Sequence, residues 1–270
     1  MKAIVNTQVC HLHSRPTRES SLADEVLYGM VVELLEEAAP GWYRVRTHYR
    51  YEGFAAAEDL LPEGAEAWEQ AEKIMVLHKN QCDVLSEPRV QGYPMQTLPR
   101  GGLVIPVEEA QEGWRKVKLA DGRVGFVPAA IPVPQPLEPV SREEEVLRSR
   151  LVETALTYRG THYRWGGKSP QGIDCSGLCS MAYMLCGILI FRDADIREGF
   201  PIREIPLEQM KPGDLIFFPG HVAMYMGDDR YCHSTAKAGF NGFAVNSLNP
   251  AHPDYREDLH KTITKIGSYF

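Results

Sequence analysis

The chain has 270 residues, of which 44% are hydrophobic and 24% are charged, and its formal net charge at pH 7 is -7. This length exceeds that of one typical compact domain, so we expect two or three domains, each with a core of its own. The negative charge argues against nucleic acid or an anionic membrane surface as the main partner, and a small or cationic ligand fits it better.

The sequence contains neither a run of about 18 apolar residues that would span a bilayer nor a continuous apolar stretch within Met1 to Gln8. We therefore expect a cytoplasmic protein, or a periplasmic or secreted one if a signal peptide has been removed. The cysteines are sparse and form no C-x-x-C pair, which favours reduced thiols over a disulfide framework or a zinc knuckle. They are Cys10, Cys82, Cys175, Cys179, Cys186 and Cys232.

A repeat organises the first half of the chain. A single gapless shift superimposes Cys10 on Cys82, Gly41-Trp42 on Gly113-Trp114, and Gly53-Phe54 on Gly125-Phe126. Between these positions apolar residues alternate with polar ones, and Gly, Pro and Asp recur at short intervals, which is typical of short strands joined by turns. Each copy is therefore predicted to be a small all-β barrel.

The order of signals in each copy resembles that of bacterial SH3-like domains, over residues 1–62 and 74–133: a Pro near the first strand, a Gly before an apolar strand, then Gly-Trp and Gly-Phe. Such domains commonly bind peptidoglycan peptides, and an alternative is that they shape a neighbouring active site. Trp42 and Trp114 are better explained as core or rim aromatics than as ligand-binding residues, since large aromatic side chains dominate small cores. The copies differ in side chains, because Glu25 and Tyr51 of the first correspond to Thr97 and Arg123 of the second.

Two linkers are predicted. Residues 63–72 are rich in Ala and Glu and favour a short helix between the barrels. Four prolines between positions 132 and 139 favour an extended segment that does not continue a central strand. The sequence Ser141-Arg142-Glu143-Glu144 then has the form of a capping box for a helix, so we place a third domain at 141–270.

Cys175 in the third domain lies where a nucleophile is expected, at the start of a predicted helix. After a glycine-rich turn, Asp174 is expected to cap a helix that runs to Gly187, with Cys175 in its first turn. There the helix dipole favours the thiolate, and free main-chain N–H groups can bind an oxyanion. Cys179 and Cys186 lie further along the helix and are expected to be buried apolar side chains.

Two histidines follow on predicted strands over residues 213–218, 221–226 and 230–234. A two-residue turn between the last two strands would pair His233 with Met224, on the face opposite His221, whereas a three- or five-residue loop puts both histidines on one face. A thiol–histidine hydrolase requires the second arrangement. One cysteine with two histidines also suits a three-ligand zinc site, but the thiolate interpretation of Cys175 is preferred, and no cofactor is expected.

Residues 150–248 resemble the NlpC-type family of bacterial cell-wall cysteine peptidases. Its signature stands here as Asp174-Cys175-Ser176-Gly177, its histidine motif as His221 to Gly227, and its third polar residue as His233. Tyr163 matches the tyrosine beside the family's oxyanion site. The resemblance implies an α+β papain-like catalytic domain preceded by two SH3-like barrels, in which His221 is the base, His233 orients it and Cys175 attacks the substrate carbonyl.

The Arg192-Asp193 pair and the two barrels resemble a recycling subgroup of this family, the γ-D-glutamyl-L-diamino-acid endopeptidases. This implies a peptidoglycan stem peptide as substrate, with diaminopimelate or lysine after γ-D-Glu and a free amine on an N-terminal L-Ala that the first barrel helps to recognise. The chemistry of an ammonium group calls for carboxylate and hydroxyl acceptors. The expected substrate-binding residues are Asp174, Ser176, Glu25 and Tyr51.

Alternatives remain for the barrel residues and for the activity. Tyr49 can replace Tyr51, and Glu25 is equally explained as a solvated surface charge. The chain as a whole can be a wall-peptide-binding protein with an inactive peptidase domain, or an acyl amidase or transferase on the same scaffold.

Overall fold

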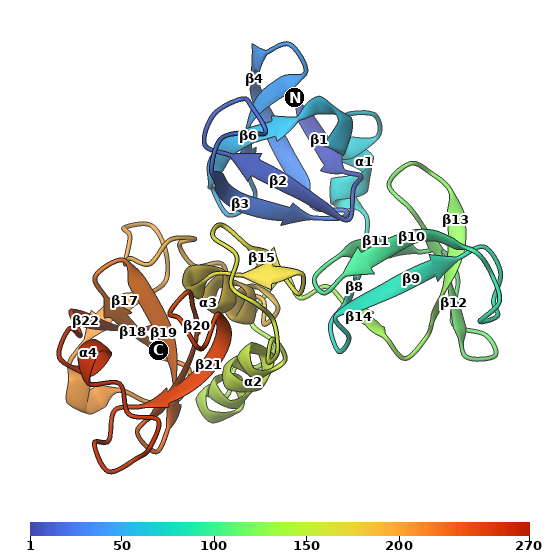
Figure 1. Cartoon of the computed structure of the whole chain (residues 1–270). Helices are drawn as coiled ribbons and strands as arrows, with labels where there is room; N and C mark the ends of the chain where they lie inside the picture. The colour runs from blue at the N-terminus through green and yellow to red at the C-terminus, as the bar shows by residue number, and fades with distance from the viewer. The chain divides into compact units, whose positions relative to one another are not determined.

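The structure is a computed structural model that describes residues 1–270, and it divides into two compact units, Met1–Gln135 and Pro136–Phe270 (Figure 1). Both predicted barrels lie within the first unit, and the predicted catalytic domain lies within the second. None of the helices is long and apolar enough to cross a membrane. Each unit is described in turn.

The first barrel is a seven-stranded antiparallel sheet with the strand order β3-β2-β6-β5-β4-β1-β7. Alternate residues of its strands are buried, including Cys10 and Leu12 on β2, which is the pattern expected of a barrel wall. Its strands are β1 (Lys2–Val5), β2 (Val9–His13), β3 (Leu22–Leu27), β4 (Val31–Ala39), β5 (Trp42–Thr47), β6 (Glu52–Ala56) and β7 (Leu60–Leu61), with a 3-10 turn at η1 (Ala57–Asp59).

The second barrel repeats this topology strand for strand, in the order β10-β9-β13-β12-β11-β8-β14, and so bears out the sequence repeat. Its last strand begins at Pro132 and pairs only with β8 at the edge of the sheet, a position where a residue without an N–H is tolerated. The proline-rich linker is thus extended as expected, but its first part belongs to the barrel. The strands are β8 (Ile74–Val76), β9 (Gln81–Leu85), β10 (Pro94–Pro99), β11 (Leu103–Pro106), β12 (Trp114–Lys118), β13 (Val124–Pro128) and β14 (Pro132–Pro134).

The barrels share buried contacts. The Tyr28 side chain packs into the core of the second barrel, where its hydroxyl accepts a hydrogen bond from the Ala120 N–H at 2.9 Å. The predicted linker helix is present as α1 (Ala65–Gln70), and its buried Trp68 donates from Nε1 to the Gly29 carbonyl at 2.7 Å. These contacts join the two barrels into one unit.

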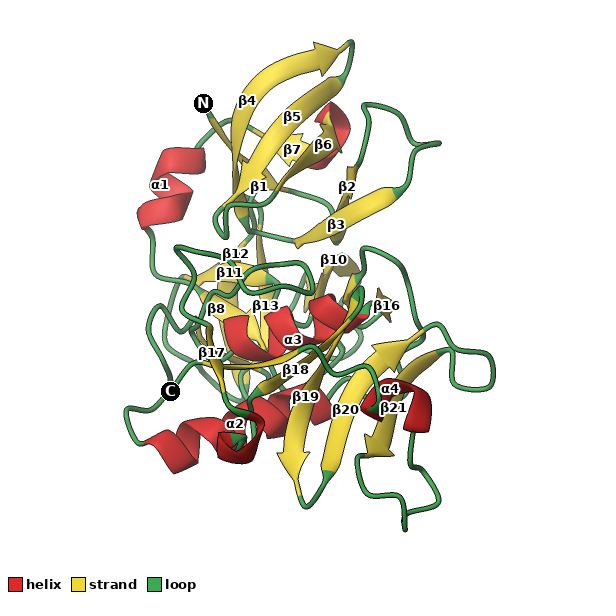
Figure 2. Cartoon of the chain, turned by 90° about the vertical axis from the view of Figure 1, so that its left-hand side faces the viewer, coloured by secondary structure: helices red, strands yellow, loops and turns green.

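The second unit combines a six-stranded antiparallel sheet with two main helices; Figure 2 shows the helices α2 and α3 in red and the strands in yellow. The sheet order is β17-β22-β18-β19-β20-β21, and α3 packs on β19, β20 and α2. The elements are α2 (Glu144–Leu156), β15 (Lys168–Ser169), β16 (Gly172–Ile173), α3 (Cys175–Met184), β17 (Arg203–Ile205), η2 (Leu207–Gln209), β18 (Leu215–Phe218), β19 (His221–Gly227), β20 (Arg230–Thr235), β21 (Gly242–Ser247), α4 (Glu257–His260) and β22 (Lys265–Ser268).

The predicted start of α2 is wrong by about half a turn. Ser141 does not cap the helix, because its hydroxyl instead accepts a hydrogen bond from the Glu143 N–H at 3.1 Å in a local turn. The helix therefore begins at Glu144, with Glu143 as the N-cap residue and no side-chain cap. At the other helix the expectation is confirmed: α3 ends at Met184, and Gly187 follows with a φ of 84° that favours glycine.

Candidate active site

Cys175 is the first residue of α3, as predicted. Asp174 is the N-cap, and its Oδ1 accepts a hydrogen bond from the Gly177 N–H at 2.5 Å. The main-chain N–H groups of Ser176 and Val222 donate toward the Cys175 sulfur. Because Val222 follows His221 on β19, these contacts fix the thiol at the start of the strand that carries the histidine.

The protonation state of Cys175 differs from the sequence expectation. The two N–H groups favour the thiolate, as a helix start should, but burial outweighs them and raises the pKa of the thiol to about 11, with the Asp174 charge adding to the increase. The resting side chain is therefore a thiol. Its proton has to be removed as the sulfur attacks, which requires a neutral base nearby.

The two predicted histidines meet. His221 Nε2 lies 2.7 Å from His233 Nδ1, and His233 Nε2 lies 2.9 Å from Asn246 Oδ1. This geometry fits the predicted role of His233 in orienting His221. Asn246 extends the row of hydrogen-bonded side chains by one residue. His233 and Asn246 are almost completely buried, whereas His221 is partly exposed and precedes Val222, whose N–H donates toward the Cys175 sulfur.

The way in which the histidines reach one face was predicted wrongly. The loop between β19 and β20 is the two-residue turn Asp228-Asp229, both with positive φ, and Gly227 pairs with Arg230. A bulge between Tyr225 and Gly227 shifts the register by one residue, so that Met224 pairs with Cys232 rather than His233. The bulge, and not a longer loop, turns His233 toward His221.

Both histidines are neutral at neutral pH. Burial, reinforced by the positive charge of Arg256, lowers the pKa of His221 to about 4 against a smaller opposing effect of Asp174. Burial and the neighbouring His221 lower the pKa of His233 to about 3. A neutral His221 can accept the proton of the Cys175 thiol.

A charged cluster holds the start of α3. Arg192 is buried and donates to Asp174 Oδ1 and Oδ2, both at 3.1 Å, and to Ser176 Oγ at 2.8 Å. The Asp174 carboxylate also accepts from the Gly166 N–H at 2.8 Å and the Ser176 hydroxyl at 3.2 Å. Asp174 and Ser176 therefore organise the nucleophile's turn, and their predicted contact with a substrate ammonium stays a prediction.

Tyr163 lies near the thiol. Its main chain is held by a hydrogen bond to the Asn241 carbonyl at 2.9 Å and by a parallel bridge to Ile173, the residue before Asp174. Burial, with added effects of Cys175 and Asp174, raises the pKa of Tyr163 to about 12. The phenol is thus a donor at neutral pH, as the predicted oxyanion role requires.

The barrel residues predicted to bind substrate have well-defined surroundings. Glu25 on β3 is buried and lies 3.4 Å from His11 Nε2, so it is not the solvated surface charge of the alternative interpretation. Tyr49 supports this strand: its hydroxyl donates to Asp24 Oδ2 at 2.5 Å and approaches the Glu25 carbonyl at 3.3 Å. Tyr51 is half-buried and donates through its main chain to Thr47. Substrate contacts of Glu25 and Tyr51 stay predictions.

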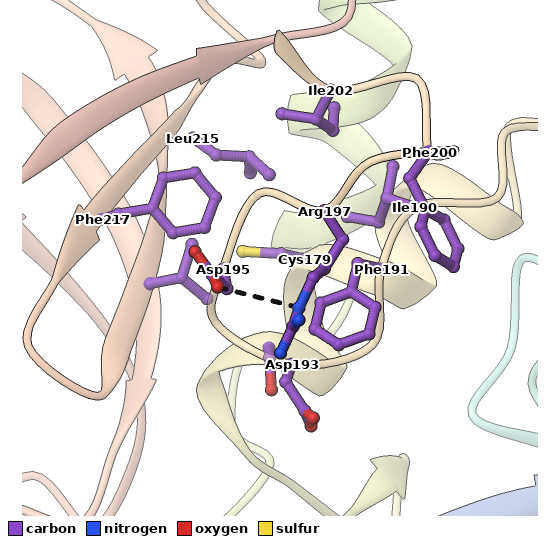
Figure 3. A pocket seen from close by; sticks show the side chains of 12 residues that line it. Cys179, Ile190, Phe191, Asp193, Asp195, Arg197, Phe200, Ile202, Leu215 and Phe217 are labelled. Atoms are coloured by element: carbon purple, nitrogen blue, oxygen red, sulfur yellow. Dashed lines mark ion pairs between the residues drawn. The ribbon is translucent and has the colours of Figure 1, made fainter. Parts of the chain in front are cut away.

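A pocket beside the catalytic residues escaped the sequence analysis. Ser176 and Val222, the neighbours of Cys175 and His221, both line it, and Figure 3 shows aromatic side chains and an acid–base pair around it. The pair is Arg197 with Asp195, at 3.8 Å, and Asp195 also contacts Lys265 Nζ at 2.6 Å. No local motif predicts this pocket, because its walls come from α3, from the segment after it, and from β18 and β19.

Asn246 was also missed, and Arg192 had been noticed only as part of a family pattern. Asn246 lies on β21, where alternation of the buried Gly242, Ala244 and Asn246 with half-buried Phe243 and Val245 identifies the inward face. A polar residue on that face, one strand away from a predicted catalytic histidine, was the available signal.

Two family models match the sequence. The model of the NlpC/P60 family matches residues 160–257, which include Cys175, His221, His233 and Asn246. The model described as the bacterial dipeptidyl-peptidase SH3 domain matches residues 12–60, within the first barrel. The papain-like and SH3-like folds expected from the sequence are confirmed.

Relatives and solved structures extend this likeness over the whole chain. Dipeptidyl-peptidase 6 of Lysinibacillus sphaericus is 46% identical over 275 residues, with 100% of both chains covered. The γ-D-glutamyl-L-lysine dipeptidyl-peptidase of Bacillus subtilis strain 168 is 29% identical over 215 residues, covering 73% of this chain and 68% of its own length. A crystal structure of an NlpC/P60 family protein from Bacillus cereus shares the fold, with a TM-score of 0.80 and 21% identity over 100% of this chain and 99% of that one.

Proposed function

Because the chain belongs to the NlpC/P60 family of peptidases, we propose that it is a cysteine endopeptidase that hydrolyses the bond between γ-D-Glu and an L-diamino acid in free murein peptides. The observation that carries the proposal is the chain from the Cys175 turn to His221 and His233, with 2.7 Å between the two imidazoles. It supplies a nucleophile at a helix start and a neutral base held by a second residue, the arrangement that acyl transfer needs.

The reaction follows from this geometry. The Cys175 sulfur attacks the carbonyl carbon of the γ-D-glutamyl bond while its proton passes to His221. The tetrahedral intermediate then collapses: the carbon–nitrogen bond breaks, the imidazolium returns the proton to the departing amine, and a thioester remains. Water, deprotonated by the same imidazole, attacks the thioester and releases the acid and the thiol.

The negative oxygen of the tetrahedral intermediate meets two donors. The Cys175 N–H is at the first position of α3, where main-chain N–H groups have no partner within the helix. The Tyr163 hydroxyl, protonated at neutral pH, is the second. Loss of one such donor typically costs about 10²- to 10³-fold in kcat.

The substrate class is supported by the relatives' names, one of which specifies a γ-D-glutamyl-L-lysine bond and both of which specify dipeptide release. Release of a dipeptide requires recognition of a free amine two residues from the cleaved bond. An ammonium group requires carboxylate and hydroxyl oxygens as acceptors. We propose that Glu25 and Tyr51 of the first barrel bind this amine together with Asp174 and Ser176, with L-Ala as the N-terminal residue.

The test uses the tripeptide L-Ala-γ-D-Glu-L-Lys, its diaminopimelate counterpart and the N-acetylated form of each. The wild type should release L-Ala-γ-D-Glu from the free-amine peptides, and mass spectrometry detects the product. The Cys175→Ala variant should bind the peptides without turnover. Equal cleavage of the acetylated peptides would contradict amine recognition, and binding by the wild type without any product would show a wall-peptide-binding protein instead.

Transfer chemistry has its own readout. If a transferase activity prevailed, an added amine nucleophile would appear in the product in place of water, as an amide of the dipeptide. Hydrolysis alone, in the presence of such an amine, supports the peptidase.

A further inference from the structure

Asn246 ends the histidine chain, and both atoms of its amide are used. It lies on β21 opposite Tyr231 of β20 and is 1% exposed. Its Nδ2 donates to the Asp254 carbonyl at 2.8 Å, and its Oδ1 lies 2.9 Å from His233 Nε2. A buried side-chain amide with both ends occupied is rotationally fixed, because turning it would leave two groups without partners.

The orientation of this amide follows from its Asp254 partner. A carbonyl oxygen can only accept, so it requires the NH₂ end of Asn246 and leaves the amide oxygen for the histidine. The Asp254 carbonyl is itself held in place, since it accepts a second hydrogen bond from the Ser247 N–H at 3.2 Å and the next residue, Tyr255, forms a bridge with Ser247. The backbone therefore determines which atom of Asn246 faces His233.

The proton positions along the chain then follow in order. Facing an oxygen that only accepts, His233 must carry its proton on Nε2, so its Nδ1 in the neutral ring is a lone pair. That lone pair, 2.7 Å from His221 Nε2, requires a proton on the His221 nitrogen. The remaining His221 nitrogen, Nδ1, is thereby left unprotonated.

We propose that Asn246 is a positioning residue that sets the tautomers of both histidines, so that His221 presents an unprotonated Nδ1 to the Cys175 thiol. The expected effects on peptide cleavage rest on the proposed function, whereas the expected tautomers do not. In the opposite tautomer, His221 Nδ1 carries a proton and cannot accept one from the thiol. Asn246 thus acts two residues away from the reacting atoms and touches neither the thiol nor the substrate.

A neutral amide suits this position better than a carboxylate. The charged groups that act on the pair are Arg256 and Asp258 on His233, and Arg256 and Asp174 on His221, while the Tyr231 ring lies against His233 with centroids 5.3 Å apart. A carboxylate at position 246 would add a negative charge next to a buried imidazole and favour its protonated form. The amide fixes the tautomer without supplying that charge.

Two variants separate this role from a merely structural one. Asn246→Leu removes the acceptor and the donor, whereas Asn246→Asp keeps an acceptor for His233 and loses the NH₂ group that holds the Asp254 carbonyl. For cleavage of the free-amine tripeptide we expect Asn246→Leu to lower kcat by about 10²-fold with KM within about twofold. Asn246→Asp should retain most of kcat above neutral pH, with its acidic limb displaced to higher pH.

The opposing result is equally specific. If Asn246 served only to anchor the Asp254 segment, both variants would lose activity alike, because both lack the NH₂ group. The matched control is Asn249→Leu, the same replacement at an asparagine just beyond β21 that contacts Asp229 and not the histidines. Its kcat and KM should equal those of the wild type.

A spectroscopic readout needs no substrate. In protein labelled with ¹⁵N-histidine, two-bond proton–nitrogen correlations at pH 7 should show Nε2–H tautomers for both His221 and His233 in the wild type. In Asn246→Leu the two rings should lose this preference, and in Asn246→Asp His233 should keep it. An Nδ1–H form of His233 in the wild type, or unchanged tautomers in Asn246→Leu, would overturn the inference even if the peptide is cleaved. Intact tautomers without cleavage would instead count against the proposed function alone.

Discussion

Two buried polar clusters flank Cys175, and they differ in charge. At the start of α3, Arg192 and Asp174 form an ion pair with Ser176 between them. Along β19 to β21, His221, His233 and Asn246 form a chain of hydrogen bonds, and its imidazoles are neutral at neutral pH. The first cluster surrounds the main chain of Cys175. The second begins at His221, the proposed acceptor of the thiol proton, and ends at Asn246.

The difference shows where a protein interior tolerates fixed charge. A buried ion pair offsets its desolvation only when its hydrogen bonds are satisfied, and Asp174 meets this condition through main-chain N–H groups that must stay in place. Within the histidine chain, a fixed charge would bias one protonation state of the imidazoles, although the proton must move both ways during a turnover. The charged Arg192–Asp174 pair therefore positions the turn at the start of α3, while the neutral imidazoles accept and return the proton.

The largest expected effect comes from removing the base. His221→Gln should lower kcat by about 10⁴-fold, because no other group of the neutral cluster is placed to accept the thiol proton. The urea midpoint of the variant should change much less than that of variants in the charged cluster. Steady-state rates and unfolding curves measured on the same preparations check both statements, and a large loss of stability in His221→Gln would erase the distinction between the clusters.

The second prediction tests the charged cluster for stability. Arg192→Met leaves the Asp174 carboxylate buried without its cation, which should cost about 3–5 kcal/mol of unfolding free energy. Arg197→Met is the matched control, because Arg197 is exposed and pairs only loosely with Asp195, so its loss should cost less than about 1 kcal/mol. Similar unfolding midpoints for the two variants would show that the cluster does not hold the turn.

The third prediction concerns a charge outside both clusters. If the Glu25 carboxylate contributes to binding of the substrate amine, as proposed, Glu25→Gln should raise KM for the free-amine tripeptide about 10- to 100-fold with no effect on the acetylated peptide. The equivalent residue of the second barrel is Thr97, which bonds Asp83 on the surface at 2.6 Å. Thr97→Ala should leave KM unchanged, and an unaltered KM in Glu25→Gln would return amine recognition to the charged cluster.

The smallest effect is a pH dependence of the neutral cluster. The pKa of His221 is lowered to about 4 in the folded protein and is about 6.5 in an unfolded chain. Below pH 6.5 the unfolded state therefore binds more protons, so stability should decline gradually as the pH falls toward 4. Over the same window kcat/KM should remain level until His221 itself protonates near pH 4.

Urea midpoints at pH 7.0, 5.5 and 4.5 check this, with His221→Gln as the comparison. The variant should lose less stability on acidification than the wild type. An acidic limb of kcat/KM near pH 6.5 would show that the imidazole is not depressed, and the description of this cluster as neutral would then fail.

The charged cluster was largely visible in the sequence, and the neutral one was not. Asp174, Cys175 and Ser176 are consecutive, so the cap and the helix start follow from local preferences. The meeting of His221 with His233 depends on strand register, and the bulge that sets it has no clear local signal, because its turn suggested the opposite face. Asn246 reaches His233 only through pairing of β20 with β21, which no spacing rule predicts.

The barrels illustrate the same division. Their strand order was foreseeable because the repeat carries its glycines and aromatics in the same places twice. The burial of Glu25 and the contact of Tyr49 with Asp24 were not, since both depend on which side of a strand faces inward after a turn. Tyr28 likewise crosses into the neighbouring barrel for reasons that only packing reveals.

The bulge between Tyr225 and Gly227 makes catalysis depend on the register of one strand pair. A regular ladder with the same turn and the same number of residues would pair Met224 with His233 and turn His233 to the far side of the sheet. Such a chain would retain all of the signature residues and most of its fold, and it would be inert. Deleting Met226, the extra residue of the bulge, would instead leave a regular hairpin in which Met224 still pairs with Cys232, so both histidines would stay on one face. Competence therefore depends on how the two strands pair and not only on the presence of the two histidines.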